Sequence, residues 1–246
     1  EELLKNYPQN ENIAETHRIL GNAYYYSGDE ARAINHLSEY VSSAPQPLRG
    51  DQYILGVCYY NRGDFQDAIN TLSQTVKEND ALAQNAYHYL GQSYLNLNEK
   101  ANARLAFELA ATSTFDRAVQ EAATYNYALL IHETSFTGFG ESVTVFENFL
   151  NDFPQSPYTD KVNDYLVEVY LTTKSYDAAL RSIEKIKHPS DKIMGAKQNV
   201  LFQLGTQSFA NANFTDAISY FEQSIAIGRY MPAVMADAYF WKGESH

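Results

Sequence analysis

Residues 55–72 read LGVCYYNRGDFQDAINTL, and this stretch decides the fold because its pattern recurs along the chain. Its opening, Leu55-Gly56-x-x-Tyr59, returns as Leu20-Gly21-x-x-Tyr24 and as Leu90-Gly91-x-x-Tyr94. We call the position of Gly56 the anchor of each copy, and the anchors are Gly21, Gly56, Gly91, Ala128, Val167, Gly205 and Gly243. Successive anchors are 35, 35, 37, 39, 38 and 38 residues apart, so the sequence is a tandem array of repeats.

Each copy carries two apolar patterns of helical spacing with a turn between them. Twelve residues after the anchor comes a second small residue, and four further on a large apolar one, as at Ala68 and Leu72. The turns are 27–29, 62–64, 97–99, 138–140, 173–175 and 211–213. Glycine in these turns suits a positive φ, and we expect Asp29, Asp64 and Asn213 to accept hydrogen bonds from the amides that open the second helix.

This pattern of Leu-Gly-x-x-Tyr, then Ala-x-x-x-Leu or Phe, then Pro resembles the tetratricopeptide repeat, whose period is about 34 residues. Pro45 and Pro154 stand where a proline ends the second helix. The resemblance covers almost the whole chain and implies an all-α fold, a right-handed α-solenoid of tandem helix-turn-helix repeats. The chain differs from the family pattern in its longer later repeats and in lacking the first-helix tryptophan in most copies, Trp241 alone coming near it.

We expect a single solenoid domain over residues 1–246. Its predicted repeats are 14–47, 49–82, 84–118, 121–157, 160–188 and 198–231, with partial repeats at 1–12 and 236–246. Leu4, Tyr7 and Pro8 align with the end of a second helix at 149–156, and the last partial repeat begins a first helix. Because the ends of a natural array usually carry a polar capping helix, we interpret the chain as a fragment of a longer protein.

Composition excludes several classes of function. The 30 acidic residues against 18 basic ones, a net charge of −12, disfavour nucleic acid and anionic lipid as partners. Cys58 is the sole cysteine and is interpreted as a small packing residue, and the six histidines form no zinc motif. No catalytic or phosphate-binding motif occurs, so the sequence predicts no enzyme, cofactor or metal. No apolar run approaches the roughly 18 residues of a membrane span, which argues against direct membrane insertion.

The tetratricopeptide resemblance implies that the first helices line a concave face that binds partners. In the first four copies, tyrosines there alternate with amides and imidazoles, a mixture that suits stacking and backbone hydrogen bonding with an extended peptide. The expected binding residues are Arg18, Asn22, Tyr25, Tyr53, Tyr60, Asn61, His88, Gln92, Asn96, Tyr125 and His132. The sequence therefore predicts a non-enzymatic scaffold that binds a protein or peptide partner.

Other interpretations stay open. The array could instead be a regulatory or targeting module of a larger multidomain protein, or the tyrosines could bind a glycan. A third hypothesis is the carboxylate clamp of some tetratricopeptide co-chaperones, whose first two positions Arg18 and Asn22 match. Against the clamp, Ile54 stands where it needs an asparagine, and Asn85 with His88 stand where it needs basic residues.

Residues 148–158 also resemble the Tyr-Pro-x-Ser-x-Tyr junctions of bacterial envelope tetratricopeptide lipoproteins, of the outer-membrane assembly and cell-division type. That second resemblance implies a scaffold of the bacterial periplasm or cell envelope. The alternatives are a cytoplasmic assembly factor and a plain helix-ending proline, which any array of long repeats needs.

Overall fold

The computed structural model describes residues 2–6, 11–134 and 140–246, and every regular element in these ranges is an α-helix. The helices are α1 (Glu2–Asn6), α2 (Ile13–Tyr26), α3 (Glu30–Ser43), α4 (Arg49–Arg62), α5 (Phe65–Leu72), α6 (Ala81–Asn96), α7 (Lys100–Thr112), α8 (Arg117–Thr134), α9 (Glu141–Asp152), α10 (Thr159–Thr172), α11 (Tyr176–Ile183), α12 (Asp191–Ala210), α13 (Phe214–Ile227) and α14 (Pro232–Glu244).

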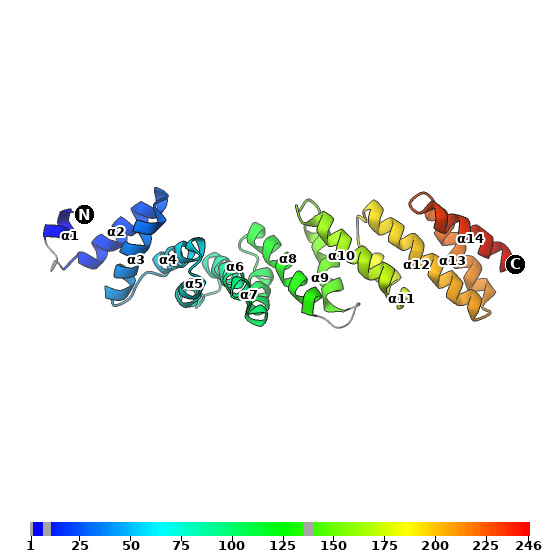
Figure 1. Ribbon diagram of the computed structural model, residues 1–246, viewed down its shortest axis with the longest axis horizontal. Helices are drawn as coiled ribbons and strands as arrows, with labels where there is room; N and C mark the ends of the chain where they lie inside the picture. The colour runs from blue at the N-terminus through cyan, green and yellow to red at the C-terminus, as the bar shows by residue number, and fades with distance from the viewer. Residues whose placement is uncertain (1, 7–10, 135–139) are drawn as a thin grey trace. The chain divides into compact units, whose positions relative to one another are not determined.

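The helices form two compact units, residues 1–127 and 128–246, with the boundary inside α8. Within the first unit, α2 packs on α3, α4 on α5 and α6 on α7, and within the second α12 packs on α13 (Figure 1). These are the helix-turn-helix pairs of a tetratricopeptide-like solenoid, so the predicted all-α fold is confirmed. The single domain over the whole chain stays a prediction.

The anchor glycines allow the two helices of a pair to touch. A Cβ atom added at Gly56 would lie 2.5 Å from Cγ of Leu72, far inside van der Waals contact. The same holds at three other anchors, where the nearest side-chain atom is 2.6 or 2.7 Å away: Gly21 with Leu37, Gly91 with Phe107 and Gly205 with Phe221. In all four pairs the large residue comes sixteen positions after the glycine, which is why the two recur together in sequence.

Four of the described turns between paired helices contain a residue in the left-handed conformation. Gly28 and Gly63 have φ angles of 83° and 86°, as expected from the sequence. In two further turns the same role falls to Asn98 at φ 59° and Ala212 at φ 58°. A positive φ is costly for a residue with a Cβ, so Ala212 holds a strained conformation.

Two of the three predicted helix caps form. The Asp29 side chain accepts from the amide of Arg32 at 3.1 Å, and Asn213 accepts from the amide of Asp216 at 3.4 Å. The prediction for Asp64 is wrong, because its carboxylate makes no cap hydrogen bond and instead accepts from the guanidinium of Arg62.

A polar residue seven positions before the anchor ties a repeat to the chain segment that leads into the next one. Gln84 is fully buried, and its amide nitrogen donates to three carbonyl oxygens: that of Ala110 in the last turn of α7, and those of Ser113 and Asp116 after the helix. Gln198 likewise donates to the carbonyl of Gly228 and accepts from the amide of Met231. Arg49 donates to the Thr75 carbonyl and to Asp80, which lowers the pKa of the Asp80 carboxyl to about 2.

Among the described helices, none is long and apolar enough to cross a membrane. Pro45 follows the end of α3 by two residues and Pro154 follows α9 in the same way, so both end a second helix as expected. The expected turn at 138–140 lies outside the described residues except for Gly140, and Tyr7 and Pro8 lie outside them too.

Candidate functional site

Four tyrosines from three successive first helices gather in the first unit. The ring centroids of Tyr60 on α4 and Tyr89 on α6 are 5.2 Å apart, with the planes inclined at 66°. Tyr53 lies 6.2 Å from the same Tyr89 ring at 67°. Tyr25 on α2 is an electrostatic neighbour of Tyr53 and Tyr89. We call these four residues the tyrosine cluster: Tyr25, Tyr53, Tyr60 and Tyr89.

The phenols of Tyr25, Tyr53 and Tyr89 stay protonated at physiological pH, because burial raises the pKa of each. Burial raises the pKa of Tyr53, and the nearby hydroxyls of Tyr89 and Tyr25 and the Asp116 carboxylate raise it further. Burial also raises the pKa of Tyr25, with the Cys58 thiol, Tyr89, Tyr26 and Glu30 adding to the effect. These three residues therefore present neutral hydroxyls that can both donate and accept hydrogen bonds.

Asparagines flank the cluster. Asn61, at the end of α4, is exposed and donates to the Glu30 carboxylate at 2.6 Å. Asn22 on α2 donates to Asp51 at 2.8 Å and to the carbonyl of Arg18 at 2.9 Å. Both amides keep a carbonyl oxygen as acceptor, which a peptide N–H could use.

Arg18 is engaged by acidic neighbours. Its guanidinium forms a two-pronged pair with Glu15, at 2.8 and 2.6 Å, and lies 3.6 Å from the buried carboxylate of Asp51. Since Asn22 bonds to the same Asp51, the first two positions of the carboxylate clamp already hold a carboxylate of the chain itself. The clamp hypothesis therefore has no support in this geometry.

Of the predicted residues on α6, His88 contacts the cluster. His88 packs edge-on against Tyr89 and Phe107, each with centroids 5.9 Å apart, and its Nδ1 atom is buried without a hydrogen-bond partner. Burial lowers the pKa of His88, so the ring is neutral at pH 7. Asn96 donates to the carbonyl of Gln92 one turn earlier, at 2.9 Å, and both side chains reach the surface.

The two predicted residues of α8 are placed differently. Tyr125, in the first unit, is only 7% exposed, so its side chain offers little surface to a partner. His132 belongs to the second unit, where it packs 5.1 Å from Tyr165 and 6.1 Å from Phe146. The structure thus brings together Tyr25, Tyr53 and Tyr60 but does not join His132 to them.

Tyr89 is the cluster member that the sequence reasoning missed. It stands two residues before its anchor, Gly91, at a position not expected to face the partner. The available signal was the run of aromatic rings at 87–89, which gives α6 an aromatic residue on more than one face.

Cys58 is fully buried, and burial, aided by the Glu30 carboxylate, raises the pKa of its thiol to about 12. A thiol this weakly acidic is scarcely ionised at neutral pH and is a poor nucleophile. Cys58 therefore acts as the packing residue expected from the sequence.

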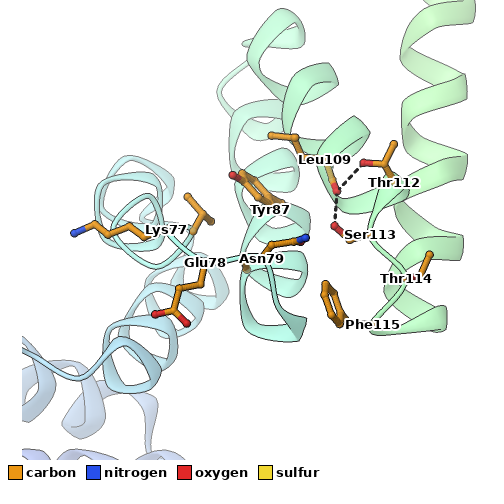
Figure 2. Close-up of a pocket in the computed structure, with 11 residues that line it drawn as sticks. Lys77, Glu78, Asn79, Tyr87, Leu109, Thr112, Ser113, Thr114 and Phe115 are labelled. Carbon is orange, nitrogen blue, oxygen red and sulfur yellow. Dashed lines mark hydrogen bonds between the residues drawn. The ribbon is translucent and has the colours of Figure 1, made fainter.

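A cavity lies elsewhere in the first unit. A cavity of about 470 Å³ is bounded by the segment between α5 and α6, by α6, and by the end of α7 with the residues after it. Figure 2 shows Tyr87 and Leu109 at this hollow, with Thr112 and Ser113 both bonded to the Leu109 carbonyl. Phe115 lies at the same hollow and is 52% exposed.

This cavity adjoins another of about 240 Å³, with which it shares Val76, Tyr87 and Leu109. Leu105 and Leu109, one turn apart on α7, are 59% and 47% exposed there. The sequence signal, missed above, is this pair of leucines at i and i+4 beside the buried stripe of Ala103, Ala106, Phe107 and Ala110.

Comparison with known proteins agrees with the helix pairs. The family model of the tetratricopeptide repeat matches residues 55–130, which run from α4 into α8. Residues 55–130 are therefore similar in sequence to tetratricopeptide repeats. Such repeats form protein-binding modules. Two residues of the tyrosine cluster, Tyr60 and Tyr89, lie inside the matched stretch.

Solved structures of tetratricopeptide proteins resemble the chain at low identity. A tetratricopeptide repeat protein from Parabacteroides merdae is 15% identical with a TM-score of 0.49, and the match covers 98% of this chain and 89% of that protein's chain. One from Bacteroides fragilis is 14% identical with a TM-score of 0.45, covering 94% and 98%. The TPR2AB domain of yeast Sti1, in complex with pHSP90, is 11% identical with a TM-score of 0.42, covering 96% and 99%.

No curated protein sequence matches the chain. These comparisons give no evidence for the second resemblance, to bacterial envelope lipoproteins.

Proposed function

We propose that this chain is a non-enzymatic scaffold whose first helices bind a protein or peptide partner, with the tyrosine cluster at the centre of the site. The supporting observation is that Tyr53 and Tyr60 of one repeat contact Tyr89 of the next. Tyr25 of the preceding repeat, 64 positions before Tyr89, is an electrostatic neighbour of Tyr53 and Tyr89. A ligand lying across α2, α4 and α6 would touch all three repeats at once.

The chemistry of the cluster suits an extended peptide. Tyrosine offers a large, rigid surface for packing and a hydroxyl for hydrogen bonding, at little cost in side-chain entropy. The carbonyl oxygens of Asn22 and Asn61 can accept from peptide amides, since their nitrogens already bond to Asp51 and Glu30. His88, Gln92 and Asn96 extend the surface along α6, and Arg18 marks its border on α2.

The experiment is a selection of random decapeptides on the immobilised 246-residue chain, followed by calorimetric titration of the strongest binder. The double variant Tyr25→Ser plus Tyr60→Ser is expected to raise the dissociation constant at least about tenfold, because buried aromatic contacts dominate such interfaces. Tyr239→Ser, at a tyrosine 58% exposed in the second unit, is the matched control.

Circular dichroism must show the same helical content in all three proteins. Equal affinity of the wild type and the double variant would show that the binding site is not at the tyrosine cluster.

A second candidate is that the array is a regulatory or targeting module of a longer protein. What supports it is that residues 55–130 match the tetratricopeptide repeat, which forms protein-binding modules. Reading the gene that encodes the complete protein tests it directly: an attached kinase, DNA-binding or protease domain supports the module, and further helical repeats alone speak against it.

For the compartment, we propose the bacterial periplasm or cell envelope, on the likeness of residues 148–158 to envelope junctions. Fractionation of cells that express the complete protein, followed by immunoblotting, tests this. Recovery with cytosolic markers would favour the rival, a cytoplasmic assembly factor.

A further inference from the structure

Every arginine on the three first helices of the cluster is already paired with an acidic residue. Arg18 binds Glu15 and lies beside Asp51, Arg49 binds Asp80 and Glu78, and Arg62 binds Asp64. α6 carries neither lysine nor arginine. The positive charge of these helices is therefore satisfied by the chain itself, and an acidic ligand finds no charge-assisted donor there.

Two carboxylates near the cluster are held by neutral donors instead. Glu30 accepts from the side-chain amide of Asn61 at 2.6 Å. Asp116 accepts from the backbone amides of Ala118 and Val119 at 3.0 and 3.2 Å. A hydrogen bond from a neutral group leaves the negative charge in place, so both carboxylates still attract a cation.

These carboxylates act on the cluster itself. Glu30 contributes to the raised pKa of Tyr25, and Asp116 contributes to that of Tyr53. Burial is the main cause of the raised pKa of both tyrosines, and each carboxylate adds to it because a nearby negative charge disfavours the ionised phenol. The same negative charges favour a positive charge placed among the rings.

The rings are also arranged to receive a cation. Tyr53 and Tyr60 are inclined at 67° and 66° to Tyr89, so the rings do not stack face to face but meet at steep angles. A cation is attracted to the π face of an aromatic ring and not to its edge, and Tyr53, Tyr60 and Tyr89 are each only half-buried, so part of each ring stays accessible.

Resting on the proposed function, we infer that the peptide bound by the tyrosine cluster carries a lysine or arginine whose cationic group lies against Tyr53, Tyr60 and Tyr89, with Glu30 and Asp116 beside it. Residues 1–127 as a whole fit this partner, because they contain 16 acidic residues against 9 basic ones. Long-range attraction would then speed the encounter with a basic segment.

The test uses the decapeptide selection in two parallel arms, on the wild type and on Tyr25→Ser plus Tyr60→Ser. Peptides recovered by the wild type alone are expected to contain lysine and arginine at least about twice as often as the starting library. Replacing the enriched cation by glutamine in the strongest peptide is expected to weaken binding about tenfold, since the cation–π contact and the field of the carboxylates are lost together.

A protein variant isolates the charge. Glu30→Gln is expected to weaken binding of the same peptide about threefold at 50 mM NaCl. The difference in affinity should shrink at 500 mM NaCl because salt screens the attraction. Glu39→Gln, an exposed residue of the same helix α3, is the control and should bind like the wild type.

The outcomes separate the two claims. Peptides that depend on the cluster but lack enriched cations, or that bind Glu30→Gln as tightly as the wild type, overturn the cationic partner and leave the scaffold function standing. If the wild type recovers no peptide that the double variant fails to recover, both the scaffold site and the cationic partner are wrong.

Discussion

At the scale of single residues, the turn between α12 and α13 contains a strained alanine. Ala212 has a φ of 58°, where glycine has no steric cost and alanine pays roughly 1–2 kcal/mol. Ala212→Gly is therefore expected to raise the free energy of unfolding by about 0.5–1 kcal/mol, after the extra entropy of glycine in the unfolded chain is subtracted. Urea denaturation measures this, and a lower stability for Ala212→Gly would contradict the strain.

Glu147 on α9 is a buried acid. It is 2% exposed and accepts a hydrogen bond from the hydroxyl of Ser182, which also bonds to the Tyr170 hydroxyl at 2.6 Å. The ammonium nitrogen of Lys185 lies 3.7 Å from the Glu147 carboxylate. Burial raises the pKa of the Glu147 carboxyl in spite of the opposing effects of Ser182 and Lys185. A raised folded-state pKa means that ionisation costs more in the folded protein than in the unfolded chain.

Stability linked to Glu147 is accordingly full below its unfolded pKa, near 4.5, and is lost as the pH rises through the raised folded value. Glu147→Gln keeps a hydrogen-bonding side chain but cannot ionise. We expect it to raise the urea midpoint at pH 7 and to change it little at pH 4, with exposed Glu168→Gln as control. An equal effect at both pH values would show that ionisation of Glu147 is not the cause.

The residues that sequence reasoning misjudged have partners that the repeat pattern does not specify. Arg18 looked available for a ligand, but its partner Asp51 comes from the next repeat, 33 positions later. Asp64 has the right residue type for a cap, yet the neighbouring Arg62 takes its carboxylate. Local pattern predicts which group could bond, and the tertiary structure decides which partner it finds.

At the scale of helices, the close approach of α4 and α5 depends on Gly56. Gly56→Val is expected to lower the free energy of unfolding by at least about 2 kcal/mol, because its Cβ would overlap Leu72 and force the helices apart. Gly50→Ala is the matched control: it lies on the same helix with no atom within 4 Å, so it should be neutral or stabilising by up to about 1 kcal/mol. A tolerated Gly56→Val would refute the role of the anchor.

The tie between α6 and the segment after α7 depends on Gln84. Gln84→Leu has similar volume but leaves the carbonyl of Ser113 and the amide of Asp116 without their partner. Each buried unsatisfied group costs about 1–3 kcal/mol, so a loss of about 2–4 kcal/mol is expected by urea denaturation. The exposed Gln74→Leu should change stability by less than about 0.5 kcal/mol.

Helix pairing could be predicted from the sequence because both residues of a close contact recur with it. Gly56 and Leu72 are sixteen positions apart, as are Gly91 and Phe107, and the structure places each pair in contact. The ties at Gln84 and Gln198 were not predicted, although both stand seven positions before an anchor. Their partners are mostly backbone groups, which leave no residue-type signal.

At the scale of the whole molecule, the repeat pattern predicts the helix-pair architecture but not which face binds a partner. The anchors dictate packing inside each pair, whereas the tyrosine cluster arises from contacts between pairs, as between Tyr60 on α4 and Tyr89 on α6. The cavity beside Tyr87 and Leu109 offers a rival surface in the same unit.

Hydrogen exchange of the complete 246-residue chain, alone and saturated with the selected decapeptide, distinguishes these two surfaces most directly. If the peptide binds at the tyrosine cluster, amide exchange in α2, α4 and α6 near the cluster becomes slower. The exchange rates of residues 76–79 and 109–115 around the cavity then stay unchanged. Protection confined to residues 76–79 and 109–115 would contradict binding at the cluster and would place the binding site in the cavity.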